Sequence, residues 1–283
     1  GREYFRIDVH ADGTRTCVAH TEIDDRPSVM RDAIYSLDKN WMPTDCAMRL
    51  SVDSKFMGSG WFRFHPAYAE CETWTALEGR ISQRMDLAEP LVTFQNHAIA
   101  CDAWHLRLID RQQPGKVQRV KQILLSSPDH RGATGPLLYS IGLSLVYVGP
   151  EKVTVEAGTF DAWHYQFVTN PELPQEHPPY DVWCTADGEF LFLKGGVAGY
   201  MQTPYALAEL TRSYRAPLRL VARGTTDRVI VVATQVIGDQ HGHALQHRVI
   251  VGADGPRSCH RVGALIELGR RNHLARWLLY DFD

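Results

Sequence analysis

The sequence predicts a mainly β protein: a curled antiparallel sheet or barrel with a C-terminal strand-plus-helix extension. Many short segments alternate apolar and polar residues with a period of two, which is the pattern of half-buried strands. Turn-prone pairs such as Asp12-Gly13 separate these segments at short intervals. Before about residue 210, almost no stretch has the spacing of a long amphipathic helix.

The N-terminal part begins with a predicted β-hairpin. Residues 3–10 alternate, Ala11-Asp-Gly13 forms the turn, and residues 14–22 continue as the second strand. Further strands are expected over residues 29–37, 45–52, 71–76 and 80–87, and residues 52–64 are expected to form another hairpin that ends in an aromatic strand. Because the connections between them are short, these strands predict an antiparallel meander that curls into a barrel or a strongly bent sheet.

Two later segments combine an aromatic face with a histidine on the opposite face. In a predicted strand over residues 159–168, Trp163 and Tyr165 alternate with His164 and Gln166. The segment 101–109 has the same alternation and is also predicted as a strand, with Trp104, Leu106 and Leu108 against Ala103, His105 and Arg107. We expect each strand to bury its aromatic side, so that the histidine side faces solvent or a barrel cavity. Residues 91–100 before the second segment are read as a short helix or a loop.

The character of the chain changes after about residue 211. Apolar strands are expected over 218–222, 229–237 and 246–252, and residues 261–280 have a patchy helical spacing of apolar residues. We therefore expect a barrel-like ligand domain over 1–212. Residues 213–283 would supply C-terminal strands and a helix, either packed on the barrel or completing it.

Composition narrows the class of protein. The 283 residues carry a formal net charge of −3 with no run of Lys and Arg, so nucleic acid is a poor default partner. No segment is long and apolar enough for membrane insertion, and a cytoplasmic location is expected. The six cysteines are dispersed without a CxxC pair, which favours buried thiols over a zinc ribbon or a disulfide framework.

Three stretches carry a resemblance to a known kind of protein: Val153 to Ala162, Tyr180 to Gly188, and Tyr200 to Leu210. They resemble a family of uncharacterised bacterial proteins with a curled antiparallel sheet, related in shape to lipocalin-like and lipoprotein-carrier folds. The resemblance covers about residues 1–210. It implies either the carriage of apolar ligands or cofactor-free chemistry of the kind performed by phenolic acid decarboxylases and hydratases.

A second resemblance is local. The stretch Arg248-Val-Ile-Val-Gly-Ala-Asp-Gly-Pro-Arg-Ser-Cys-His-Arg261 is similar to the second flavin-contacting motif of aromatic-ring flavoprotein monooxygenases. The resemblance implies that Asp254 would touch the ribityl chain. The sequence departs from that family because no Gly-x-Gly-x-x-Gly follows an N-terminal strand, and without it the pyrophosphate lacks its usual binding site. We therefore expect no cofactor.

The candidate catalytic residues are His164, His105 and His130 as acid/base groups and Asp181 as an orienting carboxylate. The candidate substrate-binding residues are Arg131, Arg107, Tyr200, Tyr205, Trp163 and Trp183. Each has a structural alternative: a surface or hydrogen-bonded histidine, an exposed aspartate that opens a strand, or a ring that fills the edge of the core. His241, His243 and His247 have no nearby Cys or Glu, so no metal site is predicted.

These expectations lead to a functional hypothesis. The aromatic content suits an apolar cavity with a few polar groups, as in most small-molecule sites. We predict a cofactor-free isomerase, lyase or hydratase that moves a proton on a small apolar or aromatic molecule. The alternative is a non-catalytic carrier of such a ligand, and a flavin-associated fragment is a third reading. A homodimer is compatible with the sequence.

Overall fold

The computed structural model describes residues 1–168, 179–198, 203–212, 221–225, 228–238, 244–254, 262–267 and 278–280. The chain divides into two compact units, Gly1–Glu209 and Leu210–Asp283. The division falls close to the 212/213 boundary expected from the sequence, and each unit is described separately below. Whether residues 213–283 pack on the first unit or complete it stays a prediction.

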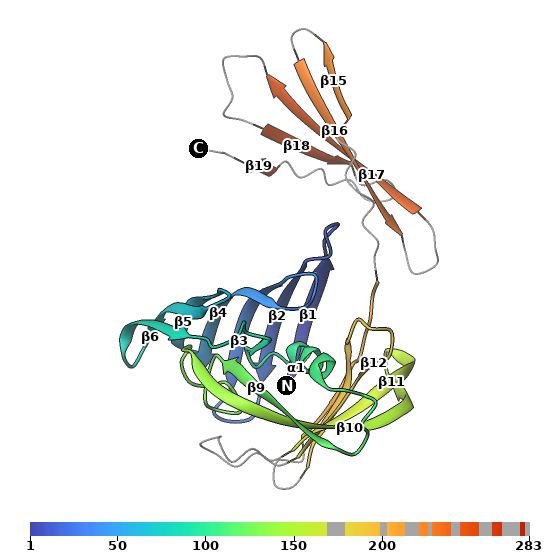
Figure 1. Ribbon diagram of the computed structural model, residues 1–283. Helices are drawn as coiled ribbons and strands as arrows, with labels where there is room; N and C mark the ends of the chain where they lie inside the picture. Colours follow the sequence, from blue (N-terminus) through green and yellow to red (C-terminus); the bar gives the residue numbers. More distant parts are fainter. Residues whose placement is uncertain are drawn as a thin grey trace. The chain divides into compact units, whose positions relative to one another are not determined.

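The first unit begins with a seven-stranded antiparallel meander. Its strands follow one another in chain order (Figure 1): β1 (Arg2–Val9), β2 (Arg15–Ile23), β3 (Val29–Leu37), β4 (Pro43–Val52), β5 (Lys55–Phe64), β6 (Tyr68–Thr75) and β7 (Gly79–Asp86). In β3 buried and exposed residues alternate almost perfectly, so one face packs inward and the other meets solvent. The predicted meander is confirmed, including the hairpin turn at Asp12, whose side chain accepts the Thr14 backbone N–H at 3.0 Å.

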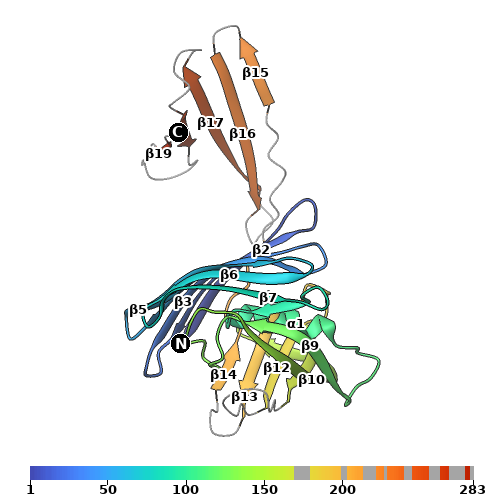
Figure 2. The same cartoon turned by 60° about the vertical axis from the view of Figure 1, so that its left-hand side comes forward.

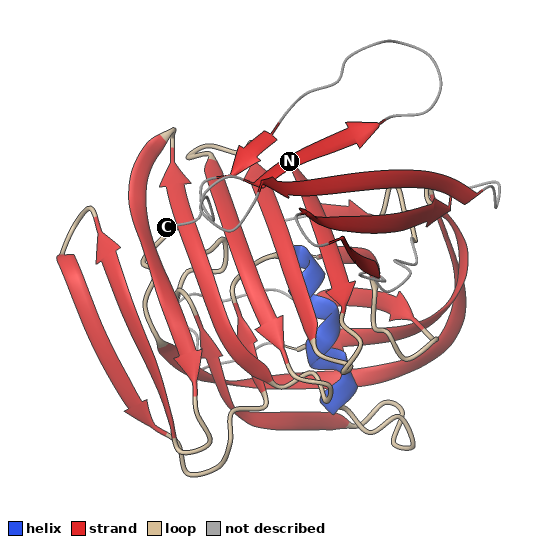
Figure 3. Ribbon diagram, turned by 90° about the horizontal axis from the view of Figure 1, so that it is seen from above, coloured by secondary structure: helices blue, strands red, loops and turns tan. Residues whose placement is uncertain are grey.

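A second seven-stranded sheet follows, in the order β14-β13-β12-β11-β10-β9-β8. Its strands are β8 (Thr93–Gln95), β9 (Val117–Leu125), β10 (Tyr139–Val155), β11 (Gly158–Phe167), β12 (Tyr180–Thr185), β13 (Phe192–Val197) and β14 (Thr203–Ala206). Only the β8–β9 pair is parallel among the pairs described in this sheet. Both sheets curve strongly, and one short α-helix lies between them (Figures 2 and 3). The mainly β, curled fold class is thus confirmed.

The strand predicted over residues 101–109 is wrong. These residues belong to the helix α1 (Ile99–His105) and a 3-10 turn η1 (Leu106–Leu108). The alternation of Trp104, Leu106 and Leu108 was misleading because a short apolar run fits either period. Local signals favour the helix: alanines occupy positions 98, 100 and 103, and the Asn96 side chain accepts the Ala98 backbone N–H at 3.0 Å. Among the described residues, no helix has the length and apolar composition that crossing a membrane requires.

Both sheets and α1 contribute to one hydrophobic core. Tyr35 of β3 stacks on Trp104 of α1 with ring centroids 5.3 Å apart, and Phe62 of β5 contacts Phe94 of β8 at 5.0 Å. These four side chains are fully or almost fully buried. They pack against one another, so a good part of the aromatic content is used in core packing. The cysteines of the described part of the chain, positions 17, 46, 71, 101 and 184, are free and buried.

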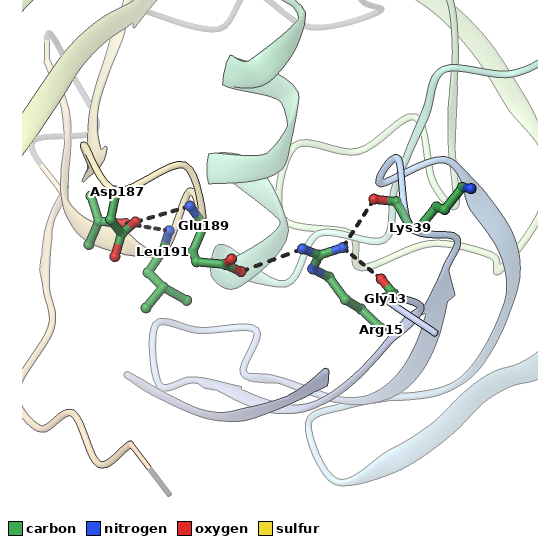
Figure 4. A network of polar contacts seen from close by, with 7 residues as sticks. Gly13, Arg15, Lys39, Asp187, Glu189 and Leu191 are labelled. Carbon is green, nitrogen blue, oxygen red and sulfur yellow. Dashed lines mark hydrogen bonds and ion pairs between the residues drawn. The ribbon is translucent and has the colours of Figure 1, made fainter. Parts of the chain in front are cut away.

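A polar network links the start of β2 to the turn between β12 and β13 (Figure 4). One amino group of Arg15 donates to the carbonyl oxygens of Gly13 at 3.0 Å and Lys39 at 3.4 Å. The other lies 3.6 Å from the carboxylate of Glu189 in that turn. The Arg15 guanidinium also covers the ring of Trp41, with its Cζ atom 4.0 Å from the ring centroid. Through Glu189, Arg15 of the first sheet contacts the turn between two strands of the second sheet.

The second unit contains a five-stranded antiparallel sheet in chain order: β15 (Val221–Thr225), β16 (Arg228–Gly238), β17 (Ala244–Asp254), β18 (Val262–Glu267) and β19 (Leu278–Tyr280). The strands predicted over 229–237 and 246–252 are confirmed within β16 and β17. The helix predicted over 261–280 is wrong at both described segments, which are strands. Strand β18 pairs with β17, and Gly263 faces Gly252 in this pairing. The spacing of apolar residues in this segment fits a helix or a strand, and pairing with β17 favours the strand. Residues 268–277 lie outside the described part.

Candidate functional site

Two of the candidate catalytic residues, His164 and Asp181, contact each other. His164 Nε2 lies 2.8 Å from Asp181 Oδ1, and the Gln166 amide donates to the same carboxylate at 3.2 Å. Their neighbours along the strands, Tyr165 and Val182, are completely buried in the core. Because successive side chains of a strand point to opposite faces, the pair lies on the face of the second sheet that is turned away from the core.

Trp183 lies beside this pair and is covered on both sides. The His164 imidazole stacks on it with centroids 4.1 Å apart and an interplanar angle of 12°. The Lys194 ammonium from the opposite neighbouring strand lies 4.6 Å from the ring centroid, and the indole N–H donates to Glu151. The ring therefore has protein partners on its faces and edge. Trp163 likewise packs with Phe190, at 5.5 Å, in the core-facing direction.

The predicted arginines bind backbone carbonyl groups. Arg107 donates to the carbonyl oxygen of Trp104 at 2.7 Å and to that of Val92, and burial lowers its pKa. Arg131 donates to the carbonyl oxygens of Asp25 at 2.7 Å and Pro27 at 2.6 Å. Both guanidinium groups are thus engaged by backbone carbonyl oxygens.

His130 lies half-buried in the loop before β10. The neighbouring Asp129 carboxylate accepts the Arg131 backbone N–H at 2.6 Å, so Asp129 holds a turn in this loop. Tyr200 falls outside the described residues, as do His241 and His243.

His105 belongs to a different cluster, which we call the α1 cluster: Thr93, Gln95, Asp102, His105 and Tyr180. Asp102 and His105 are three residues apart on α1 and share one helical face. Thr93 and Gln95 alternate on β8 and meet them: Thr93 Oγ1 lies 2.7 Å from His105 Nδ1, and the Gln95 amide donates to Asp102 Oδ1. Tyr180, the first residue of β12, donates to Asp102 Oδ2 at 3.0 Å.

Burial dominates the electrostatics of Asp102. Loss of solvent raises the pKa of its carboxyl group to about 7, against an ordinary value of 3.8. The hydrogen bonds from Tyr180 and Gln95 act in the opposite direction, and the nearby Glu3 carboxyl raises this pKa further. Asp102 therefore changes charge near neutral pH, while most exposed carboxyl groups are ionised there.

Glu3 of β1 positions the helix that carries Asp102. Its carboxylate accepts the backbone N–H groups of Ile99 and Ala100, each at 2.8 Å, and the hydroxyl of Thr21 at 2.7 Å. These N–H groups have no partner inside the helix, so Glu3 satisfies them from another strand. Burial raises the pKa of Glu3 while these hydrogen bonds lower it.

Aromatic rings lie on the second-sheet side of the α1 cluster. Tyr180 stacks with Phe167 at 5.6 Å and meets Tyr205 of β14 edge-on at 6.2 Å. Gly195 of β13 leaves room for this arrangement, since a Cβ atom there would lie 2.7 Å from the Tyr180 hydroxyl oxygen. Burial raises the pKa of Tyr205 to about 12, so its hydroxyl stays protonated at neutral pH.

The sequence reasoning missed Asp102, Gln95 and the contact of Tyr180 with Asp102. A strand reading of residues 101–109 places Asp102 and His105 on opposite faces, whereas a helix places them together. The spacing Asp-x-x-His among helix-forming alanines is the signal that could have found the cluster.

The described residues contain no metal-binding group, and the second half of the flavin-like motif lies outside them. Within residues 1–168, 179–198 and the shorter described segments, no group of three or more His, Cys, Asp or Glu side chains could hold a metal ion. Asp254 is the last residue of β17 and pairs with Arg228 of β16 in an antiparallel sheet. The flavin-motif residues after Asp254, up to 261, lie outside the described part of the chain.

No protein-family model matches the chain, and no curated protein matches it either. Among solved structures, a DUF1089-family protein from Pseudomonas aeruginosa is a distant structural neighbour, with 8% sequence identity and a TM-score of 0.36. The match covers 72% of this chain and 92% of that chain. The lipocalin-like family therefore stays an expectation, and the β-rich fold stands on the strands of this chain.

Proposed function

We propose that the protein is a cofactor-free enzyme that moves a proton on a small apolar or aromatic molecule, with Asp102 as the acid/base group. The observation that carries this proposal is the partly buried Asp102 carboxyl, held by Tyr180 and with a pKa of about 7. A general acid or base works best when its pKa lies near the operating pH. Buried carboxyl groups with such pKa values are typical of active sites.

The surroundings of Asp102 suit this role. Gln95 and Tyr180 each donate to one carboxyl oxygen, which fixes the plane of the group and leaves lone pairs for a proton. The rings of Phe167, Tyr180 and Tyr205 offer apolar contacts to a small ring-containing substrate. In this proposal Tyr180 acts through Asp102 and is a positioning residue.

Asp102 replaces the histidines of the sequence-based mechanism. The His164–Asp181 pair lies on the other face of the second sheet, with its imidazole stacked on Trp183. His105 belongs to the α1 cluster, yet burial lowers its pKa to about 3, so it stays neutral at physiological pH and is a poor base. His164 therefore provides a control residue for tests of Asp102.

A non-catalytic carrier is the second candidate, and one observation favours it. His105 Nε2 and Trp104 Nε1 are buried and have no hydrogen-bond partner within the described residues. Polar atoms of a ligand could satisfy such groups without any proton transfer. The two candidates differ in what the bound molecule undergoes, and isotope exchange separates them.

The test is deuterium incorporation into aryl ketones and unsaturated cyclic ketones incubated with the protein in D2O, followed by NMR. The wild type should exchange protons next to the carbonyl group, and Asp102→Asn should lower the exchange rate by about 10²- to 10⁴-fold, the usual contribution of a general base. His164→Ala should exchange at the wild-type rate. Equal rates for Asp102→Asn and the wild type would remove Asp102 from the mechanism, while binding without exchange in the wild type would favour the carrier.

A further inference from the structure

The α1 cluster contains a second polar group whose role the acid/base proposal does not explain. His105 lies three residues after Asp102 on the same helical face, where Cβ atoms are about 5–6 Å apart. Its Nδ1 atom is 2.7 Å from Thr93 Oγ1. Its other nitrogen, Nε2, is buried without a partner in the described part of the chain. One nitrogen therefore has a partner in the protein, and the other has none among the described residues.

The imidazole of His105 is neutral. Burial is the main cause, and the nearby Arg107 adds to it, so the pKa of His105 falls to about 3. A neutral imidazole carries one N–H group, and the hydrogen bond at one nitrogen selects the form of the other. When the Thr93 hydroxyl donates to Nδ1, Nε2 carries the proton and becomes a hydrogen-bond donor.

We propose that His105 Nε2–H binds the oxygen of a carbonyl group and that the substrate of the α1 cluster is a neutral ketone or aldehyde. This inference rests on the proposed function of Asp102 and deepens it. A neutral imidazole that donates to a carbonyl oxygen stabilises the negative charge that develops there, and it does so without giving up its proton.

The proton transfer balances without an oxidant or a cofactor. The Asp102 carboxylate removes a proton from the carbon next to the carbonyl group, so a C–H bond breaks and an O–H bond forms on the carboxyl. The electron pair moves into the carbonyl, giving an enolate whose oxygen accepts the hydrogen bond from His105. The Asp102 carboxyl then returns the proton to the same carbon, or to a conjugated carbon in an isomerisation.

The charges around the cluster exclude an anionic substrate. Glu3 and Asp102 are partly buried in the same region, and Glu3 raises the pKa of Asp102 through their repulsion. The buried Arg31 guanidinium donates to the carbonyl oxygens of His97 and Arg131 at the edge of this region. A carboxylate on the substrate would add a further negative charge there, and Arg107, the cation near His105, is engaged with the carbonyl oxygens of Trp104 and Val92. A neutral carbonyl compound meets no such repulsion.

The test uses acetophenone labelled with ¹³C at the carbonyl carbon as the probe. In the wild type, a hydrogen bond from His105 should move the ¹³C resonance downfield and lower the C=O stretching frequency relative to the free ketone. His105→Leu should abolish both shifts and reduce deuterium exchange by about 10²-fold, as loss of one oxyanion donor does. His105→Gln, whose amide N–H can replace Nε2–H, should restore part of the shift. His164→Leu should retain the full shift.

A measurement on the unmodified protein covers the case in which His105→Leu fails to fold. With ¹⁵N-labelled histidine, His105 should show a protonated Nε2 and an unprotonated Nδ1 across neutral pH, and Thr93→Val should disturb this pattern. The opposite tautomer in the presence of the probe would overturn the proposal. Tighter binding of benzoate than of acetophenone at pH 8 would overturn the assignment of a neutral substrate.

The two proposals can fail separately. Deuterium exchange that depends on Asp102, combined with a carbonyl shift that His105→Leu leaves unchanged, would overturn the role of His105 alone. A carbonyl shift that depends on His105 in a protein that exchanges no deuterium would support the contact and overturn the acid/base function.

Discussion

The raised pKa of Asp102 predicts a pH dependence of stability that a single substitution should remove. In the unfolded chain an aspartate ionises near its ordinary pKa of 3.8, whereas Asp102 in the folded protein ionises at about 7. The folded state therefore holds this proton more tightly. The favourable contribution is fully present below pH 3.8 and is lost as the pH rises through 7.

The magnitude follows from the two pKa values. One pKa unit corresponds to about 1.36 kcal/mol, so the difference between 3.8 and about 7 amounts to about 4 kcal/mol. Asp102→Asn keeps the shape of the side chain and does not ionise. The free energy of unfolding of Asp102→Asn minus that of the wild type should therefore increase by about 4 kcal/mol between pH 4 and pH 8.

Urea unfolding followed by tryptophan fluorescence at both pH values measures this difference, since Trp104 of α1 lies in the core of the same unit. Other carboxyl groups titrate in both proteins, so their effects largely cancel. Asp161→Asn is the matched control, because Asp161 is exposed and forms only a surface ion pair with Lys152. A difference between Asp102→Asn and the wild type that stays constant within about 1 kcal/mol across this range would refute the assignment of a raised pKa.

Three further predictions concern the residues that shape the α1 cluster. Gly195→Ala should destabilise the protein by about 1–3 kcal/mol, because its Cβ would lie 2.7 Å from the Tyr180 hydroxyl, whereas Gly196→Ala, which meets no atom within 4 Å, should cost under about 1 kcal/mol in the same thermal unfolding assay. Arg31→Met should lower the free energy of unfolding by about 2–4 kcal/mol in chemical denaturation, since it leaves the carbonyl oxygens of His97 and Arg131 without their donor. A change within experimental error would contradict this role of Arg31. Glu3→Ala should speed amide hydrogen exchange at Ile99 and Ala100, with Thr21→Val as a milder control that leaves the carboxylate in place.

Much of the fold could be predicted from the sequence because its strands obey the two-residue period. In β3 and β6 every second residue is buried, and the turns between strands contain residues such as Asp12 and Gly13 that favour tight turns. Local patterns of this kind are sufficient for a meander, in which each strand pairs with its neighbour in the chain.

The helices were predicted poorly for a physical reason. Residues 101–109 contain apolar residues at spacings that fit a strand and a helix, and the groups that decide between them lie far away in the chain. Glu3 caps the start of α1 from 96 and 97 residues away. In the second unit, pairing of β18 with β17 overrides a helical spacing in the same manner.

The candidate site shows the same division. His164 and Asp181 were each candidates from the sequence, and the structure pairs them because they lie on adjacent strands and face the same side of the sheet. The contact between Asp102 and Tyr180 spans 78 residues and joins a helix to a strand. The raised pKa of Asp102 comes from burial, which depends on both sheets being in place.

The capping of α1 by Glu3 implies an order of folding for the first unit. A helix of seven residues is too short to be stable by itself in water, since its nucleation cost exceeds the gain from so few hydrogen bonds. The N–H groups at its start donate to the Glu3 carboxylate of β1. The Asp102 carboxyl in its middle accepts a hydrogen bond from the hydroxyl of Tyr180 of β12. We therefore expect α1 to fold late, after strands from both ends of the unit have docked, so that a nascent chain released before β12 lacks the contact between Tyr180 and Asp102.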